Sequence, residues 1–144
     1  MKRLEFNIEI NTTPEKVWQI MWNDTTYKEW TNVFCEGSYA VSNWNEGDSI
    51  HFLSPSGEGM NSIIDKRIEN KFMAFKHIGE IKNFKVMPID EAVQEWIGAM
   101  EIYELAANGS ITVLNVKMDI IEKYEDYFKT TLPNALEKIK QLSE

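Results

Sequence analysis

Few residues of this 144-residue sequence could carry acid–base chemistry, and the best candidates fall in two stretches with the alternation typical of β-strands. His77 lies in "FMAFKHIG" on the same face as Phe75. Glu101 and Tyr103 lie two residues apart in "GAMEIYEL", so on a strand their side chains share one face. If that face is the inner one, Glu101 and Tyr103 could act with His77 as acid and base groups.

The orientation of the second stretch is left open by its pattern. One face would carry Trp96 and Met100, and the other would carry Ala99 and Glu101, so both faces include apolar residues. We expect Glu101 to point outward, because carboxylates are seldom buried. We expect His77 to be a hydrogen-bonded histidine of the core or rim rather than a catalytic group.

Other reactive side chains give weaker signals. Cys35 has no positively charged flanking residue that would favour a thiolate, so we expect a small, buried apolar side chain there. The histidines, His51 and His77, have no local cluster of metal-binding residues, and His51 is expected to face solvent. The turn "SGEG" lacks the spacing of a phosphate-binding loop. We therefore expect no catalytic nucleophile, no metal site and no cofactor.

The start of the chain predicts a strand followed by two short helices. "RLEFNIEIN" alternates apolar and polar residues, as a half-buried strand does. The next helix has Pro14 at its first position after a threonine cap, and "DTTYKEWT" forms a second helix capped by Asp24. Tyr27 and Trp30, three residues apart in this second helix, point the same way.

Residues 36 to 119 have the pattern of six strands joined by short turns, which predicts an antiparallel meander. Asn108-Gly109 gives the clearest hairpin turn. Residues 80–94 contain Pro88 and lack a clean period, so we expect a loop, with a helical turn at "IDEAVQ" as an option. This loop either covers the mouth of a cavity or is a surface insertion.

A long helix is predicted from about Ile121 to the end of the chain. Its apolar residues keep one stripe on both sides of Pro133, which predicts a single helix with a kink near residues 130–133. The whole pattern predicts an α+β fold. A curved antiparallel sheet of about seven strands, with two short helices after the first strand, would pack against the long helix.

Length and composition indicate the number of domains, the classes of partner and the compartment. The length predicts one domain over residues 1–144, and 15 basic against 23 acidic residues give a net charge of −8. This charge disfavours nucleic acid and anionic membranes as partners. No stretch resembles a signal peptide or a membrane span, and a lone cysteine fits a reducing compartment, so we expect a cytoplasmic protein without membrane insertion.

Aromatic residues are abundant and are expected to converge between the sheet and the last helix. They fill the core or line a cavity for a small apolar molecule, and the two alternatives have similar weight. The residues predicted to line such a cavity are Trp30, Phe52, Phe75, His77, Trp96, Phe128 and Leu132.

The sequence also resembles a known family. "INTTPEKVWQIMWNDTTYKEWT", "ENKFMAFKHIGEI", "EWIGAMEIYEL", "GSITVLNVKMDI" and "YFKTTLPNALEKIKQL" are similar to segments of START-like (SRPBCC) domains. They look most like the bacterial branch grouped with the C-terminal domain of the activator of the heat-shock chaperone ATPase. The resemblance covers essentially the whole chain, but its motifs are diffuse and indicate a fold better than a function.

The resemblance implies a helix-grip fold, in which a curved sheet wraps around a long C-terminal helix. The sheet and the helix would enclose a cavity for an apolar ligand. The resemblance also implies three alternatives for function. The first is binding or transport of a small hydrophobic ligand, and the second is regulation of a chaperone ATPase. The third is a cyclase or dehydratase. A chaperone partner or a homodimer is compatible with the sequence, and whether the chain is an enzyme is left open.

Overall fold

The computed structural model describes all 144 residues and has the α+β architecture that the sequence predicts. The helices are α1 (Pro14–Trp22), α2 (Asp24–Thr31), α3 (Glu91–Gln94) and α4 (Glu125–Ser143). The strands are β1 (Lys2–Ile10), β2 (Tyr39–Val41), β3 (Ser49–Leu53), β4 (Gly59–Ile68), β5 (Phe72–Lys82), β6 (Lys85–Val86), β7 (Met100–Asn108) and β8 (Ile111–Ile120).

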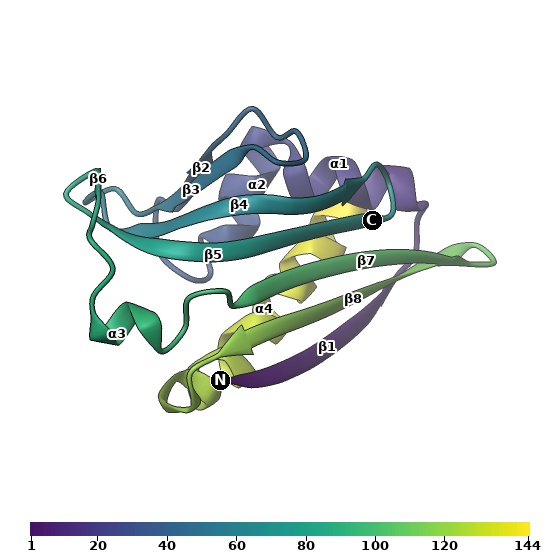
Figure 1. The fold of residues 1–144 in the computed structure, drawn as a ribbon. Coiled ribbons are helices and arrows are strands. Elements are labelled where there is room, and N and C mark those ends of the chain that lie inside the picture. The colour runs from purple at the N-terminus through teal and green to yellow at the C-terminus, as the bar shows by residue number, and fades with distance from the viewer.

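The strands form one antiparallel sheet in the order β1-β8-β7-β5-β4-β3-β2, with the short β6 paired to β5. Helices α1, α2 and α4 lie together behind the sheet in Figure 1, and α4 contacts β1, α1 and α2. A core cluster of 22 buried residues fills the space between these layers. The predicted curved sheet packed on a long helix is confirmed.

Local signals place the two short helices. The Thr13 side chain accepts a hydrogen bond from the backbone N–H of Lys16, and Pro14 takes the first helical position. Asn23 ends α1 and its side chain caps α2 by accepting from the N–H of Thr25, so the cap is Asn23 and the predicted cap, Asp24, is the first helical residue. The indole Nε1 of Trp30 donates to the Met21 carbonyl oxygen at 2.9 Å, which holds the two helices together.

The sheet curves, and then β5 and β7 divide at one end. Register shifts lie between Asn61 and Ser62 and between Ile64 and Lys66, and such bulges increase local twist. Strand β5 has 11 residues, but it pairs with β7 only over Phe72–Lys76. Beyond this pairing β6 folds back along β5 and residues 87–97 lie outside the sheet, so β5 and β7 separate (Figure 1).

Three local expectations change in detail. Residues 80–94 are only partly a loop, because β5 extends to Lys82, β6 follows, and α3 forms the optional helical turn. Strand β7 begins at Met100, after a turn in which Gly98 has φ +89°. The last helix begins at Glu125 after a 3-10 turn at residues 122–124, and it continues through Pro133. The kink at Pro133 stays a prediction.

Candidate functional site: an aromatic cavity under the sheet

A cavity of about 460 Å³ lies between the sheet, α2 and the first turns of α4. It is lined by 26 residues, of which 19 are hydrophobic. Its volume and lining are typical of sites for small molecules, which are mostly apolar with a few polar groups. The aromatic residues of the lining are Trp22, Tyr27, Trp30, Phe34, Tyr39, Phe52, Phe75, Trp96, Tyr103, Tyr124, Tyr127 and Phe128.

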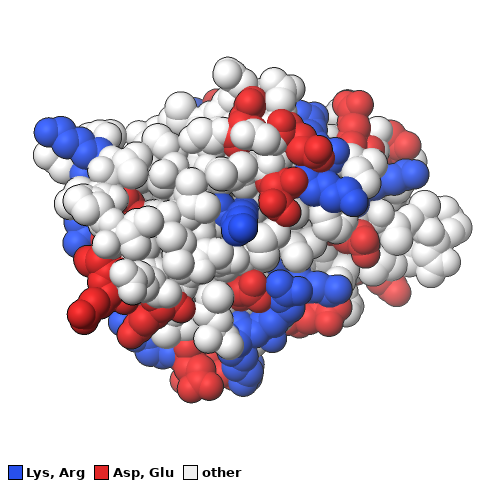
Figure 2. All heavy atoms as spheres, viewed as in Figure 1, with Lys and Arg blue, Asp and Glu red and all other residues white.

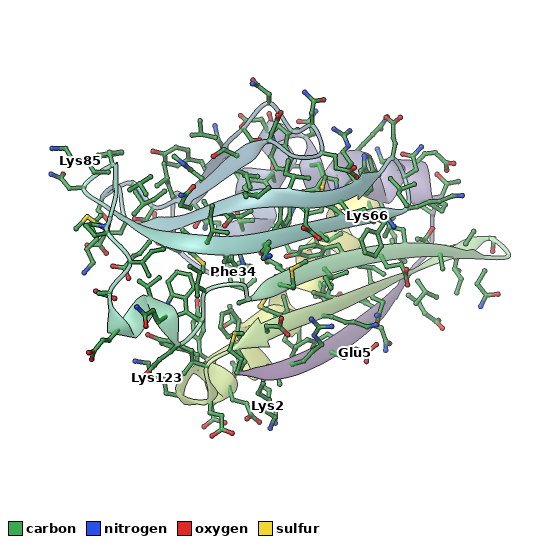
Figure 3. The ribbon with its side chains drawn as sticks, viewed as in Figure 1. Lys2, Glu5, Phe34, Lys66, Lys85 and Lys123 are labelled. Carbon is green, nitrogen blue, oxygen red and sulfur yellow. The ribbon has the colours of Figure 1, made fainter.

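The rim of the cavity is formed by the α2–β2 loop, the β3–β4 turn and the segment that leads into α4. Tyr124 and Tyr127 are each 45% exposed, and the Tyr127 hydroxyl donates to the Phe34 carbonyl oxygen at 3.0 Å. In Figure 3, Phe34 is seen where β5 and β7 separate, whereas Lys85 extends from the edge of the molecule. Residues 80–94 supply no lining residue, so the option that they cover the mouth is wrong.

Trp22 lies at the centre of the aromatic wall. Its ring centroid is 5.2 Å from that of Tyr103 and 5.5 Å from that of Phe75, both in edge-to-face geometry. Trp30 packs 6.2 Å away in the same way. Edge-to-face contacts are a favourable geometry for aromatic pairs, so these rings stabilise one another's orientation. The buried indole Nε1 of Trp22 has no hydrogen-bond partner.

His77 and Glu101 of the cavity wall belong to one chain of polar contacts across three strands. Ser62 of β4 hydrogen-bonds Nδ1 of His77 on β5 at 2.6 Å. His77 Nε2 lies 3.5 Å from Glu101 Oε2 on β7, and the Tyr103 hydroxyl donates to Glu101 Oε1 at 2.5 Å. If the Ser62 hydroxyl donates to Nδ1, the imidazole proton is on Nε2 and faces the carboxylate.

Burial determines the protonation of the two phenols. Desolvation raises the pKa of Tyr103 well above its ordinary value, and the negative charge of Glu101 raises it further. Desolvation, followed by the same charge, also raises the pKa of Tyr27. Both phenols therefore keep their protons, and Tyr103 acts as the donor to Glu101. The Tyr27 side chain is 6% exposed and lines the cavity, and its hydroxyl makes no hydrogen bond within the chain.

A second carboxylate in the wall, Asp119, is already engaged. Arg3 donates to it through Nε at 2.7 Å and through Nη2 at 3.1 Å. The backbone N–H of Met100 donates to it at 2.9 Å. The hydrogen bond from Arg3 is the main reason that the pKa of Asp119 is lowered. Asp119 thus ties the start of β7 to the end of β8.

The structure brings six of the seven predicted cavity residues to the wall. These are Trp30, Phe52, Phe75, His77, Trp96 and Phe128. Trp96 reaches the wall from the turn before β7 rather than from a strand. Leu132 does not line the cavity; it lies one helical turn beyond Phe128 and is fully buried in the packed core. That the six wall residues bind a ligand stays a prediction.

Two expectations about single residues are wrong. Glu101 faces inward, because the odd-numbered residues of β7, including Tyr103 and Leu105, form its buried face. Hydrogen bonding by Tyr103 makes this placement tolerable for a carboxylate. Cys35 is exposed on the rim rather than buried, because it lies in the loop after α2. His51 is partly exposed and does not line the cavity.

The arrangement contains an acid–base cluster, and the hydroxyl that contacts it belongs to Ser62. Ser62 is fully buried and does not line the cavity, so it is not placed to attack a ligand. No group of three or more His, Cys, Asp or Glu residues is arranged to hold a metal ion. What the cluster can do is accept hydrogen bonds, or move a proton between Glu101, His77 and a bound molecule.

Sequence reasoning missed three residues that matter here. Tyr27 shares a helical face with Trp30, and Trp22 lies four residues after Trp18, so helical spacing could have found both. Ser62 could not have been found, because its contact with His77 depends on strand register.

Neither a protein-family model nor a curated protein sequence matches the chain. Solved structures do. The Aha1 dimer from Colwellia psychrerythraea is 23% identical with a TM-score of 0.75, over 100% of this chain and 97% of that one. Protein MLL2253 from Mesorhizobium loti is 15% identical with a TM-score of 0.76, over 98% and 96%. CalU16 from Micromonospora echinospora is 11% identical with a TM-score of 0.67, over 99% and 76%.

These likenesses, with the strand order and the long C-terminal helix, define the class of fold. The chain has a helix-grip fold, in which a curved antiparallel sheet packs on a long C-terminal helix, and it shares this fold with these structures. The neighbours share architecture at low identity, so they fix the fold and leave the function to be argued from the site. The structure contains no helix with the length and hydropathy needed to span a membrane.

Proposed function

We propose that this protein binds a small hydrophobic molecule in the cavity between the sheet and α4. The observation that carries the proposal is the cavity itself: about 460 Å³ of space with 19 apolar residues among the 26 of its wall. Close-packed cores leave few voids larger than a water molecule. A space of this size fits the usual range for small ligands, and this supports the proposal.

Native mass spectrometry of freshly purified protein tests this proposal. We expect a co-purified molecule, or saturable binding of 2-(2-naphthyl)ethanol when no molecule co-purifies. Ala99→Phe adds a ring to the cavity wall and should weaken probe binding at least about tenfold. The matched control, Ala107→Phe, lies on the exposed end of β7 and should bind as the unchanged protein does. Equal binding by both variants would remove the cavity as the site.

The first alternative is a regulator of a heat-shock chaperone ATPase, supported by the likeness to the Aha1 dimer. The same likeness makes a homodimer a further proposal. On the face shown in Figure 2, acidic and basic side chains are interspersed rather than separated. An assay of the cognate chaperone's ATPase rate, with and without this protein, tests the role, and an unchanged rate rejects it. Sedimentation equilibrium tests the dimer.

The second alternative is a cyclase or dehydratase, and the observation in its favour is the inward convergence of His77, Glu101 and Tyr103. Incubation of the co-purified molecule with the protein and with Glu101→Gln tests it. A product that forms only with the unchanged protein supports catalysis, and no product with either protein rejects it.

We further propose that binding takes place in the cytoplasm, based on composition; cell fractionation checks this.

A further inference from the structure

The cavity combines an aromatic wall with one carboxylate that the protein leaves mostly unpaired. Glu101 is on the inner face of β7, and 17% of its side chain is exposed. A carboxylate has about four positions that accept hydrogen bonds. Tyr103 fills one of them, and His77 Nε2 at 3.5 Å is at the limit of a hydrogen bond. Glu101 therefore keeps acceptor capacity directed to the bound molecule.

A second polar group of the cavity is free to hydrogen-bond a ligand. The hydroxyl of Tyr27 belongs to a side chain that is 94% buried, as its 6% exposure implies, and it has no partner within the chain. Its oxygen can accept a hydrogen bond from a ligand. The rings of Tyr27 and Tyr103 both pack against Trp22, with centroids 6.4 Å and 5.2 Å away, so Tyr27 and the Tyr103–Glu101 pair lie on the same part of the wall.

The rings around this part of the wall favour positive charge. The Tyr103 ring centroid lies 5.2 Å from that of Trp22, 6.2 Å from that of Trp30 and 6.2 Å from that of Phe75. The faces of such rings attract cations, most strongly when the cation is removed from water. A protonated amine that reaches Glu101 would therefore lie beside these aromatic rings, at the same end of the cavity as the carboxylate.

The charged residues of the cavity wall also favour a positively charged ligand. The wall contains the carboxylates Glu58, Glu101 and Asp119, and it contains neither lysine nor arginine. Among the residues labelled in Figure 3, Lys2, Lys66, Lys85 and Lys123 lie on the outside of the molecule. An anionic ligand would thus be repelled by Glu101 and would meet no lysine or arginine in the wall to replace its lost hydration.

We propose that the ligand of this cavity is a cationic amphiphile, with an apolar body of aromatic size and a protonated amine that pairs with Glu101. This inference rests on the proposed binding function and specifies its ligand class. The body fills the space among Trp22, Phe52 and Phe128. The ammonium group donates to the free oxygen positions of Glu101 and to the Tyr27 oxygen.

Three probes with one ring system test the inference by isothermal titration calorimetry at neutral pH: 2-(2-naphthyl)ethylamine, 2-(2-naphthyl)ethanol and 2-naphthylacetic acid. The amine is protonated under these conditions, as alkylamines are. We expect the amine to bind about tenfold more tightly than the alcohol, because charge-assisted hydrogen bonds are the stronger ones. The acid should bind most weakly.

Glu101→Gln keeps the shape of the side chain and its ability to accept from Tyr103. We expect it to lower amine affinity about tenfold and to change alcohol affinity less than about twofold, so that alcohol binding also reports an intact cavity. Glu104→Gln, on the exposed face of the same strand, is the matched control and should change neither.

Two results would overturn the inference: an acid that binds as tightly as the amine, or an amine preference that survives in Glu101→Gln. After either result, the proposed binding function would still be supported if the alcohol binds to the unchanged protein and not to Ala99→Phe. Failure of all three probes to bind would count against the ligand class and against the binding function.

Discussion

At the scale of single residues, the site is defined by a carboxylate that a neighbouring phenol makes tolerable inside an aromatic wall. Glu101 and Tyr103 come from the same strand, and their hydrogen bond follows from a spacing of two. The sequence predicts that the two side chains share a face. It does not predict which face, because both faces of β7 carry apolar residues.

The hydrogen bond between Tyr103 and Glu101 should contribute measurably to stability. Tyr103→Phe removes the donor and should lower the free energy of unfolding by about 1–3 kcal/mol, because the carboxylate loses its only short hydrogen bond within the chain. In a Glu101→Gln background the same change should lower the free energy of unfolding by less. Urea unfolding of the unchanged protein, the two single variants and the double variant measures the coupling between Tyr103 and Glu101 as a double-mutant cycle. An equal cost in both backgrounds would contradict the assignment.

At the scale of elements, the ends of β5, β7 and α4 create the space that the side chains line. Alternation and helical periodicity predict which elements exist, and Asn108-Gly109 predicts the β7–β8 hairpin correctly. They do not predict that residues 96–99 form a turn, since Trp96 and Ala99 fit the strand pattern equally well. The separation of β5 from β7 depends on register, which no local pattern encodes.

Helix α4 passes through Pro133, which has no N–H to donate to the Lys129 carbonyl. We expect a kink there that adapts the helix to the curved sheet. Pro133→Ala restores the donor and should straighten α4. Crystal structures of both proteins would show the change as the angle between the two halves of the helix. An unchanged angle would exclude the proline as the cause.

The first residue of α4 should contribute to stability in a pH-dependent way. Hydrogen bonds from Lys129 at 2.6 Å and from Lys2 at 2.8 Å lower the pKa of Glu125 from 4.5 to about 2. A lowered pKa in the folded state means that this contribution is present above pH 4.5 and is lost as the pH falls through about 2.

The double variant Lys2→Gln, Lys129→Gln should return the pKa of Glu125 toward its ordinary value, as measured by NMR titration of its side-chain carboxyl. The control Lys28→Gln removes an exposed pair with Asp24 on α2 and should leave Glu125 unchanged. A pKa of Glu125 that stays near 2 in the double variant would refute the role of the two lysines.

At the scale of the whole molecule, one sheet bent around one long helix leaves space beside that helix. The sequence predicts this architecture because each element shows its own period and cap, and the likeness to solved structures confirms it. The sequence left a filled core and an open cavity as alternatives. Packing density is a property of all side chains together, so no local pattern could decide between them. The structure shows a cavity with an aromatic wall.

A crystal structure of the protein with 2-(2-naphthyl)ethanol tests the central claim most directly. We predict electron density for the naphthalene ring inside the cavity, between Trp22, Phe52 and Phe128, with its hydroxyl toward Glu101. Density for the probe only at the outer surface, under conditions where calorimetry shows saturation, would contradict the claim that this cavity is the binding site.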